Sequence, residues 1–294
     1  MSDFVQQQNS ICDFSHSDSW VILSPIEQSI KRKIETVGTP LKDWDIQINY
    51  GIKTGFNEAF IISTEKREEI LANCQTEEER KKTAELIRPI LRGRDIKRYG
   101  YEWAELWLVA TFPSRHYDID EYPAVKQYLL SFGIERLEQT GKTHIVNGEK
   151  VKARKKTNNK WFETQDSISY WEDFSKPKII FQEMVQESQF YYDSSAEFSC
   201  NDTCRIITGE YLPYLLLILN SHLFFYSVKH FYGGGGLGGH GVRMKHTFFQ
   251  RFPCLPYDEK IELSIGSNDS QYFEKLLCQR YDLNDEEIQH ILND

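Results

Sequence analysis

The sequence predicts a mixed α/β (α+β) fold in which strands and helices alternate along the chain. Short apolar stretches with the two-residue period of strands lie between segments that repeat every three to four residues, as helices do. The 294 residues are 40% hydrophobic and 27% charged, which is typical of an ordinary folded protein. A chain of this length forms one large domain or two smaller ones, and we expect one main domain with appendages.

The first expected element is a helix over residues 25–37, where isoleucines recur at every fourth position. Ser24 suits the N-cap, Pro25 the first turn and Gly38 the end of this helix. The alternating stretch 44–50 predicts the first strand. Further strands are expected at 59–62, 106–110, 178–183 and 204–208, and further helices at 76–86, 122–132, from 211 onward and at 285–292.

The most basic stretch, residues 141–160, is expected to form a hairpin or loop with its turn at Asn147-Gly148. Its seven cations face one acid, Glu149, which gives a local charge of +6. The cations are Lys142, Lys150, Lys152, Arg154, Lys155, Lys156 and Lys160.

The whole chain has the opposite charge, with 35 Lys and Arg against 44 Asp and Glu and a net charge of −9. This balance excludes a general nucleic-acid coat protein, so any DNA-binding face must be a local patch. Residues 1–10 lack the features of a secretory signal. The apolar stretch 211–232 is interrupted by polar residues and is too short to span a membrane. We therefore expect a soluble, cytoplasmic protein without a membrane partner.

The six cysteines are spread along the chain, as expected of reduced thiols in a cytoplasm. Cys200 and Cys204 form the one close pair. A zinc site would need a second close pair of Cys or His, and the histidines offer only loose candidates such as His240 and His246. Plain thiols are therefore preferred over a structural zinc, and no metal site is expected.

Catalytic signatures are absent from the sequence. It contains no P-loop, no Asn-Pro or Asp-Pro dipeptide and no G-x-S-x-G. The glycines at 233–239 match G-x-G-x-x-G but follow a helix, so they are interpreted as a loop. Asp95-Ile96-Lys97 and Asp258-Glu259-Lys260 match only the tail of a metal-dependent nuclease pattern. No catalytic residue is predicted.

Two segments do suggest a binding chemistry. In 51–62, glycines that permit tight turns lie beside Lys53, Thr54 and Asn57, which suits phosphate contact. In 87–103, five cations alternate with aromatic residues and are opposed by few acids. This pattern fits a nucleic-acid face and fits equally well a solvated basic turn beside core aromatics.

Six stretches in a fixed order carry a family resemblance. They are GIKTGFNEAFII (51–62), IRPILRGRDIKRY (87–99), EYPAVKQYL (121–129), KWFETQDSISYWEDFSKPKIIFQE (160–183), YLLLILNSHLFFY (214–226) and FFQRFPCLPY (248–257). The chain resembles, over about residues 20–294, the TaqI-like C-terminal specificity domain. That domain is the target recognition domain of adenine-N6 DNA methyltransferases and type IIG restriction-modification enzymes, and it is akin to the specificity subunits of type I systems.

The resemblance implies an organisation for the chain. It would have an N-terminal helical lead-in at 1–43, a target recognition domain with a mixed, curved sheet and peripheral helices at 44–257, and a helical tail at 258–294. In those enzymes this domain follows a nuclease and a methyltransferase region. The chain would then be either an excised fragment or a separate specificity polypeptide.

The resemblance also implies a function. The chain would recognise a short sequence of double-stranded DNA and direct the methyltransferase and endonuclease of a restriction-modification enzyme, without catalysis of its own. No cofactor is expected in this chain, whereas the catalytic region, in cis or in trans, would use S-adenosylmethionine and Mg²⁺. The alternatives are a metal-dependent nuclease in its own right and a protein-interaction module that uses the apolar helix 211–226.

The residues expected to contact DNA lie in the basic zones. In order of preference they are Lys53, Thr54, Asn57, Arg92, Arg94, Lys97 and Arg98, then Lys152, Arg154, Lys155, Lys156 and Asn158, and last Arg243 and Lys245.

Overall fold

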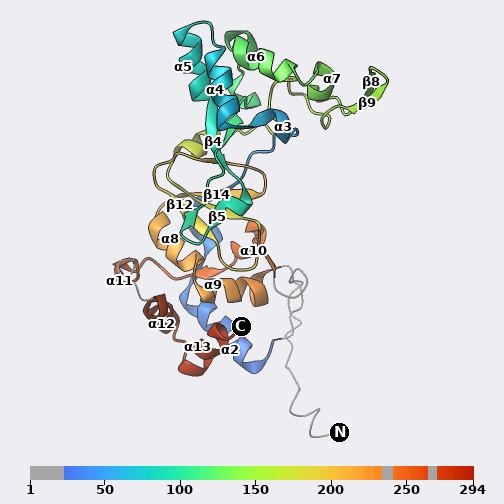
Figure 1. Cartoon of the computed structure of the whole chain (residues 1–294). Helices are drawn as coiled ribbons and strands as arrows, with labels where there is room; N and C mark the ends of the chain where they lie inside the picture. Colours follow the sequence, from blue (N-terminus) through green and yellow to red (C-terminus); the bar gives the residue numbers. More distant parts are fainter. Residues whose placement is uncertain (1–22, 234–240, 264–269) are drawn as a thin grey trace. The chain divides into compact units, whose positions relative to one another are not determined.

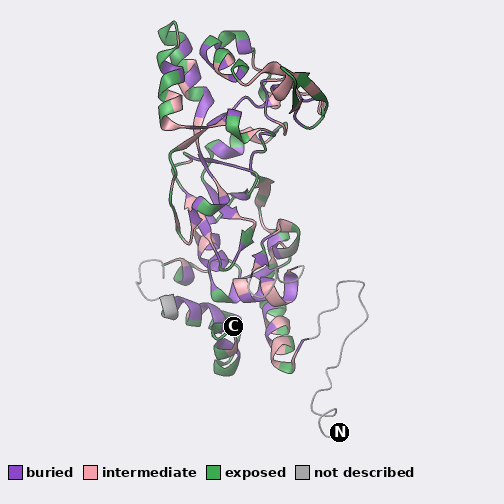
Figure 2. Ribbon diagram, turned by 45° about the vertical axis from the view of Figure 1, so that its right-hand side comes forward, coloured by how far each residue is buried: buried purple, intermediate pink, exposed green. Residues whose placement is uncertain are grey.

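The structure, a computed structural model, describes residues 23–233, 241–263 and 270–294 (Figure 1). Its helices carry buried and exposed residues on different sides (Figure 2). The strands form two four-stranded sheets and several two-stranded pairs. The α+β class predicted from the sequence is confirmed. Among the helices described, none is long and apolar enough to cross a membrane.

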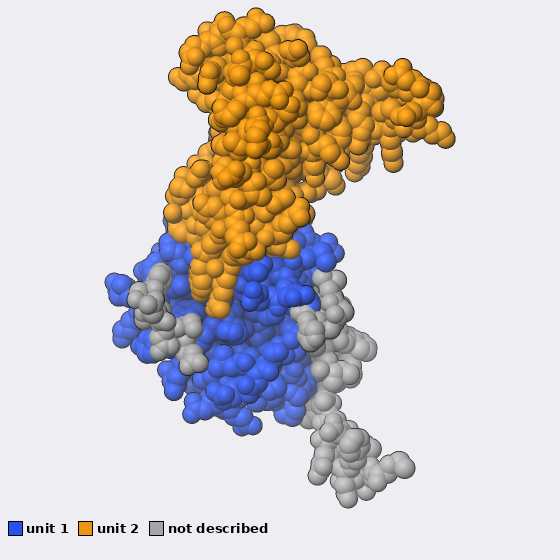
Figure 3. Space-filling model, viewed as in Figure 1, with its two compact units in different colours: residues 1–46, 183–190, 209–294 blue, residues 47–182, 191–208 orange. Residues whose placement is uncertain are grey.

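The chain divides into two compact units, coloured separately in Figure 3. Unit 1 comprises Met1–Ile46, Glu183–Phe190 and Gly209–Asp294, and unit 2 comprises Gln47–Gln182 and Tyr191–Thr208. These units do not follow the three consecutive segments 1–43, 44–257 and 258–294, because the chain leaves unit 1 twice and returns twice. The functions assigned to those segments stay predictions.

One four-stranded sheet of unit 2 has the order β13-β4-β7-β3. Its strands are β13 (Ser199–Cys200), β4 (Ile87–Leu91), β7 (Leu106–Val109) and β3 (Ile61–Ser63). The β13–β4 pair is parallel and the other pairs are antiparallel, so the sheet is mixed. Ile90, Leu91, Leu108 and Val109 have no exposed surface and form the centre of the core.

The second four-stranded sheet has the order β12-β10-β14-β2. Its strands are β12 (Phe190–Asp193), β10 (Lys178–Gln182), β14 (Cys204–Gly209) and β2 (Ile46–Tyr50). The pair β10–β14 is antiparallel. Strands β2 and β10 lie within the stretches that the sequence predicted, and β14 extends one residue beyond the predicted strand 204–208.

Five helices belong to unit 2: α3 (Asn57–Phe60), α4 (Thr64–Ala72), α5 (Glu77–Leu86), α6 (Pro123–Leu130) and α7 (Ile134–Leu137). Thr76 caps α5 by accepting a hydrogen bond from the backbone N–H of Glu79 at 3.1 Å, and three glutamates occupy its first turn, as the helix dipole favours. Helix α4 was not predicted, because its buried residues Ile70 and Leu71 are adjacent and give no helical repeat.

The predicted hairpin is confirmed as β8 (Thr143–Val146) paired with β9 (Glu149–Lys152). The turn residues Asn147 and Gly148 have φ values of 52° and 85°. Positive φ at both positions is the requirement of a type I′ turn, for which Asn-Gly is the preferred pair.

Unit 1 is mainly helical. Its elements are α2 (Pro25–Val37), α8 (Leu212–Leu219), α9 (His222–Ser227), the π-helical turn η6 (Val228–Tyr232), α10 (His246–Phe249), α11 (Glu259–Leu263), α12 (Ser270–Arg280) and α13 (Asp285–Leu292). Two short strand pairs join them: β1 (Thr39–Pro40) with β16 (Pro253–Cys254), and β11 (Met184–Val185) with β15 (Val242–Arg243).

The helix expected from residue 211 onward is interrupted after Leu219. The Asn220 side chain exchanges hydrogen bonds of 3.0 and 2.9 Å with the backbone of Phe190, and Ser221 caps the next helix by accepting from the N–H of Phe224 at 3.0 Å. Asn and Ser compete with helical hydrogen bonding in this way.

The apolar residues of α8 are core residues of unit 1, since Tyr214, Leu215 and Ile218 have no exposed surface. A protein-interaction helix would need an exposed apolar face, which these buried residues of α8 do not provide. Most of the glycine loop at 233–241 lies outside the described residues.

Unit 2 contains a fully buried ion pair between Lys178 Nζ and Asp193 Oδ2, 2.7 Å apart. Burial lowers the pKa of Lys178, and the hydrogen bond with Asp193 opposes that effect. Lys178 also donates to the carbonyl of Phe174 at 2.9 Å, and Asp193 accepts from the N–H of Phe198 at 2.9 Å. The pair therefore fixes β10 to β12 and to the loop that follows it.

We expect Lys178→Met to lower the free energy of unfolding by about 3–5 kcal/mol, because it leaves a buried carboxylate without its cation. The matched control is Lys176→Met, since Lys176 is exposed and pairs with Asp173 at 2.8 Å; this change should have a much smaller effect. Urea denaturation followed by circular dichroism measures both. Equal effects of the two substitutions would contradict the expectation.

Candidate nucleic-acid interface

Arg154 is the centre of the most basic zone, but its side chain is buried, with 2% of its surface exposed. The guanidinium donates to four backbone carbonyls: Leu137 at 2.8 Å, Thr54 at 3.0 Å, Glu163 at 2.7 Å and Trp161 at 2.5 Å. Burial, with a smaller effect from Arg136, lowers its pKa to about 10. The expectation that Arg154 contacts DNA is wrong, because its donors face inward and are already used.

The four carbonyls come from segments that are distant in sequence. Arg154 therefore joins the loop around Thr54, the end of α7 and the loop at 161–163. The backbone reinforces this junction, since the N–H of Gln165 donates to the carbonyl of Lys53 at 3.1 Å and the N–H of Gly141 to that of Arg154 at 2.8 Å.

Thr54 also has a structural position. It is 1% exposed, and its hydroxyl donates to Asn57 Oδ1 at 2.6 Å, so the prediction that it contacts DNA is not supported. The next residue, Gly55, has φ of 76°, and a Cβ there would lie 2.9 Å from Gln165 Oε1. The positive φ favours glycine at this position, and a side chain there would also require Gln165 to shift. The turn leaves Lys53 and Asn57 exposed.

The other residues of this region that the sequence predicted to contact DNA face outward. We call these residues the Arg154 surface: Lys53, Asn57, Lys152, Lys155, Lys156 and Asn158, all exposed. Within the ranges that the structure describes, none of its four lysines forms an ion pair with a carboxylate. Positive charge is therefore uncompensated at this surface.

Arg136 in α7 belongs to the same region and was missed from the sequence. Its guanidinium lies 4.0 Å from the ring centroid of Phe56, and Nη1 donates to the carbonyl of Lys152 at 2.9 Å. A single cation in a short helix gives no sequence signal, and only the fold brings it beside the basic hairpin.

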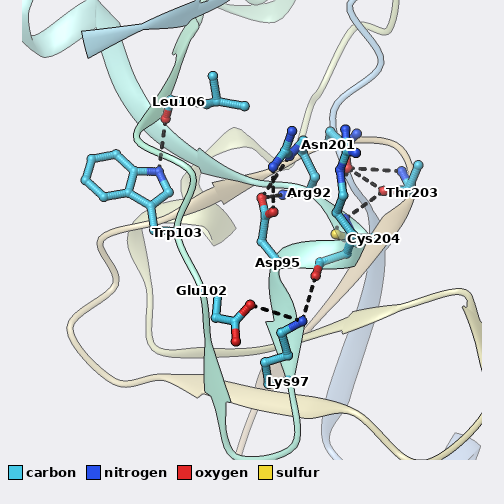
Figure 4. A network of polar contacts seen from close by, with 11 residues as sticks. Arg92, Asp95, Lys97, Glu102, Trp103, Leu106, Asn201, Thr203 and Cys204 are labelled. Carbon is cyan, nitrogen blue, oxygen red and sulfur yellow. Dashed lines mark hydrogen bonds and ion pairs between the residues drawn. The ribbon is translucent and has the colours of Figure 1, made fainter.

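The basic segment around Arg92 has a different character (Figure 4). Arg92 forms a bidentate pair with the buried Asp95, with Nε–Oδ2 at 3.0 Å and Nη2–Oδ1 at 2.8 Å, which raises the pKa of the guanidinium. Lys97 pairs with Glu102 at 3.3 Å and donates to the carbonyl of Arg94 at 3.2 Å. The charges of Arg92 and Lys97 are thus compensated within the protein.

Two further cations of this segment differ in exposure. Arg94 is exposed, whereas Arg98 is half-buried with its guanidinium 5.4 Å from the ring centroid of Tyr99. Figure 1 shows β5 (Ile96–Lys97) and the β8–β9 hairpin well apart within unit 2. The two basic zones do not form one continuous patch. For most of the Arg92 segment the structure favours the interpretation as a basic turn beside core aromatics.

The third predicted zone lies in unit 1. Arg243 is exposed in β15 and pairs with Glu183 Oε1 at 2.7 Å, and Lys245 follows as a half-buried residue. Both cations follow the glycine loop, most of which lies outside the described residues.

Cys200 and Cys204 are fully buried, and burial raises the pKa of Cys204 well above its ordinary value. Across residues 23–233, 241–263 and 270–294, no group of three or more His, Cys, Asp or Glu side chains could hold a metal ion. The aspartate of each nuclease-like tripeptide pairs with an arginine, Asp95 with Arg92 at 2.8 Å and Asp258 with Arg280 at 2.9 Å.

The family model of the TaqI-like C-terminal specificity domain matches residues 88–235, half of the chain. The chain belongs to this family. This specificity domain contains the β8–β9 hairpin, Arg154 and the exposed lysines that follow it. A search of the curated proteins gave no match.

Two solved structures of restriction enzymes match this chain. The type IIL restriction-modification enzyme MmeI, solved in complex with DNA, matches with a TM-score of 0.52 and 13% identity over 87% of this chain and 37% of MmeI. The type IIG restriction endonuclease BpuSI matches with a TM-score of 0.49 and 11% identity over 90% of this chain and 33% of BpuSI. The chain thus spans about a third of the length of these enzymes.

We expect Arg154→Met to lower the free energy of unfolding by at least about 3 kcal/mol, because the carbonyls of Leu137, Thr54 and Trp161 lose their donor and each unsatisfied group costs about 1–3 kcal/mol. The carbonyl of Glu163 keeps a second donor, Gln139 Nε2, at 3.0 Å. Lys155→Met is the matched control, since the neighbouring lysine is exposed and should tolerate the same change. Urea denaturation gives both values. If Arg154→Met were as stable as Lys155→Met, the junction described above would not depend on the guanidinium.

Proposed function

We propose that this chain recognises a short sequence of double-stranded DNA as the specificity domain of a restriction-modification enzyme. The observation that carries the proposal is the uncompensated positive charge of the Arg154 surface in a protein of net charge −9. An acidic protein that keeps four exposed lysines without carboxylate partners has a surface suited to phosphates. Membership of the specificity-domain family and the fold shared with MmeI support this interpretation.

Within this surface we assign different tasks to lysines and amides. The lysines contact phosphates, which are identical at every step and position the domain without reading sequence. Asn57 and Asn158 are suited to base edges, because an amide offers a donor and an acceptor that match adenine in the major groove. Arg94, exposed in its own zone, is a further candidate for a base or phosphate contact.

The chemistry is assigned to a separate region. We propose that a methyltransferase and endonuclease region, in cis or in trans, uses S-adenosylmethionine and Mg²⁺ on the site that this chain selects. The proposal places the protein in the bacterial cytoplasm, in defence against foreign DNA. The assignment of catalysis to a separate region rests on the specificity-domain family and on the match of this chain to only 37% of MmeI.

The phosphate assignment is tested by Lys155→Ala combined with Lys156→Ala. We expect weaker binding to all duplex sequences alike and a salt dependence that is shallower by about 0.9 units of log K per log salt for each lost contact. Lys82→Ala is the control, since Lys82 lies on α5 and pairs with Glu78 and Glu121 at 3.3 and 3.6 Å. Affinities measured by fluorescence anisotropy between low and physiological salt decide the matter. An unchanged salt slope in the double variant would refute the assignment.

The base-reading assignment is tested by Asn57→Ala. We expect a loss of about 1–3 kcal/mol on the preferred site and a relaxed preference at one base pair, with an unchanged salt slope. The measurement is selection from a randomised duplex pool by the variant and by the wild type. A uniform loss over all sequences would place Asn57 on the backbone instead.

A further inference from the structure

The two faces of the β8–β9 hairpin differ sharply. Thr143 lies opposite Lys152 and Ile145 opposite Lys150 in the register, so these four side chains share one face. All four are exposed, and Ile145 is 67% exposed. The opposite face carries His144, Val146 and Val151, which are half-buried, and Glu149.

The base of the hairpin is held firmly to unit 2. The N–H of Ala153 donates to the carbonyl of Lys142 at 2.9 Å, and Arg136 of α7 donates to the carbonyl of Lys152 at 2.9 Å. Arg154, two residues after β9, is the buried junction described above. The hairpin therefore projects from a fixed base, as the arm of unit 2 in Figures 1 and 3 shows.

The exposed face combines cations with an apolar side chain. Lys150 and Lys152 form no ion pair with any carboxylate among the residues described, whereas Lys66, Lys82 and Lys126 on the helices of unit 2 do. The exposed β-branched side chain of Ile145 lies on the neighbouring strand, directly opposite Lys150 and diagonal to Lys152. This combination suits a ligand that presents an apolar group beside negative charge.

The major groove of DNA has these properties. It is about 12 Å wide and admits a two-stranded ribbon, whose strands lie about 4.8 Å apart, whereas the minor groove is about 6 Å wide. Phosphates line both edges of the groove, and thymine presents its 5-methyl group on the floor.

We propose, resting on the DNA-binding function above, that the β8–β9 hairpin enters the major groove with its Thr143/Ile145/Lys150/Lys152 face. Ile145 contacts the 5-methyl group of a thymine in the recognised sequence. Lys150 and Lys152 contact the phosphates or the guanine edges beside it. The hairpin is thus a reading element, and the preferred site contains a thymine at the position that Ile145 reaches.

The experiment uses the 294-residue chain and duplexes that it enriches from a randomised pool, prepared with thymine or with uracil, which lacks the methyl group. We expect the wild type to bind the uracil duplex about fourfold more weakly, which corresponds to about 0.8 kcal/mol for one buried methyl group. Ile145→Ala should bind both duplexes equally.

The matched control is Leu130→Ala, since Leu130 is an exposed apolar residue of α6. This substitution should leave the difference between the two duplexes unchanged. Because Ile145 is exposed, thermal unfolding should confirm that its variant folds as the wild type does.

The outcomes separate the two proposals. A wild type without a thymine preference, or a preference that persists in Ile145→Ala, overturns the assignment of the hairpin. In that case the DNA-binding function still stands if the variant with Lys155→Ala and Lys156→Ala shows the expected shallower salt dependence. If no duplex is enriched, or single-stranded RNA or a protein is bound instead, the DNA-binding function fails, and the assignment of the hairpin fails with it.

Discussion

The buried guanidinium of Arg154 is the interaction on which the arrangement of the proposed DNA-binding surface depends. A buried cation is costly unless its donors are satisfied, and here four backbone carbonyls accept from it. The nearby Glu163 is also buried and raises the pKa of Arg154, against the lowering effect of burial. An arginine suits this position better than a lysine, because its planar fork offers five donors in fixed directions.

The burial of Arg154 determines the direction in which the residues that follow it face. Arg154 turns inward at the end of β9, and Lys155 and Lys156 then face outward. The Arg92 segment shows the alternative result, because there Asp95 takes up the charge of Arg92 and Glu102 that of Lys97. Two stretches of similar composition thus differ in the positive charge that they expose, and the difference lies in whether an acid is placed beside each cation.

Local patterns predicted most of the regular elements but not the environment of single side chains. The Asn-Gly turn and the capping residues before 25–37 act through neighbours in sequence, so the helix and the hairpin were found. The break after Leu219 depends on a contact of Asn220 with Phe190, thirty residues away, and no local pattern contains it. For the same reason the burial of Arg154 could not be foreseen, because its partners lie up to 100 residues distant. The division into two interleaved units also rests on such long-range contacts.

The use of backbone carbonyls as partners has a consequence for how specificity can vary. Every residue type carries a carbonyl, so the junction around Arg154 places little demand on the side chains of the residues that accept from it. Among the residues that the structure describes, the exposed side chains of the Arg154 surface and of the hairpin face form no hydrogen bond or ion pair, apart from the hydroxyl of Thr54 that donates to Asn57. Stability and the proposed recognition therefore rest on different residues of the same short segments. A specificity domain built in this way can exchange the side chains that we propose to face DNA without disturbing the core that positions them.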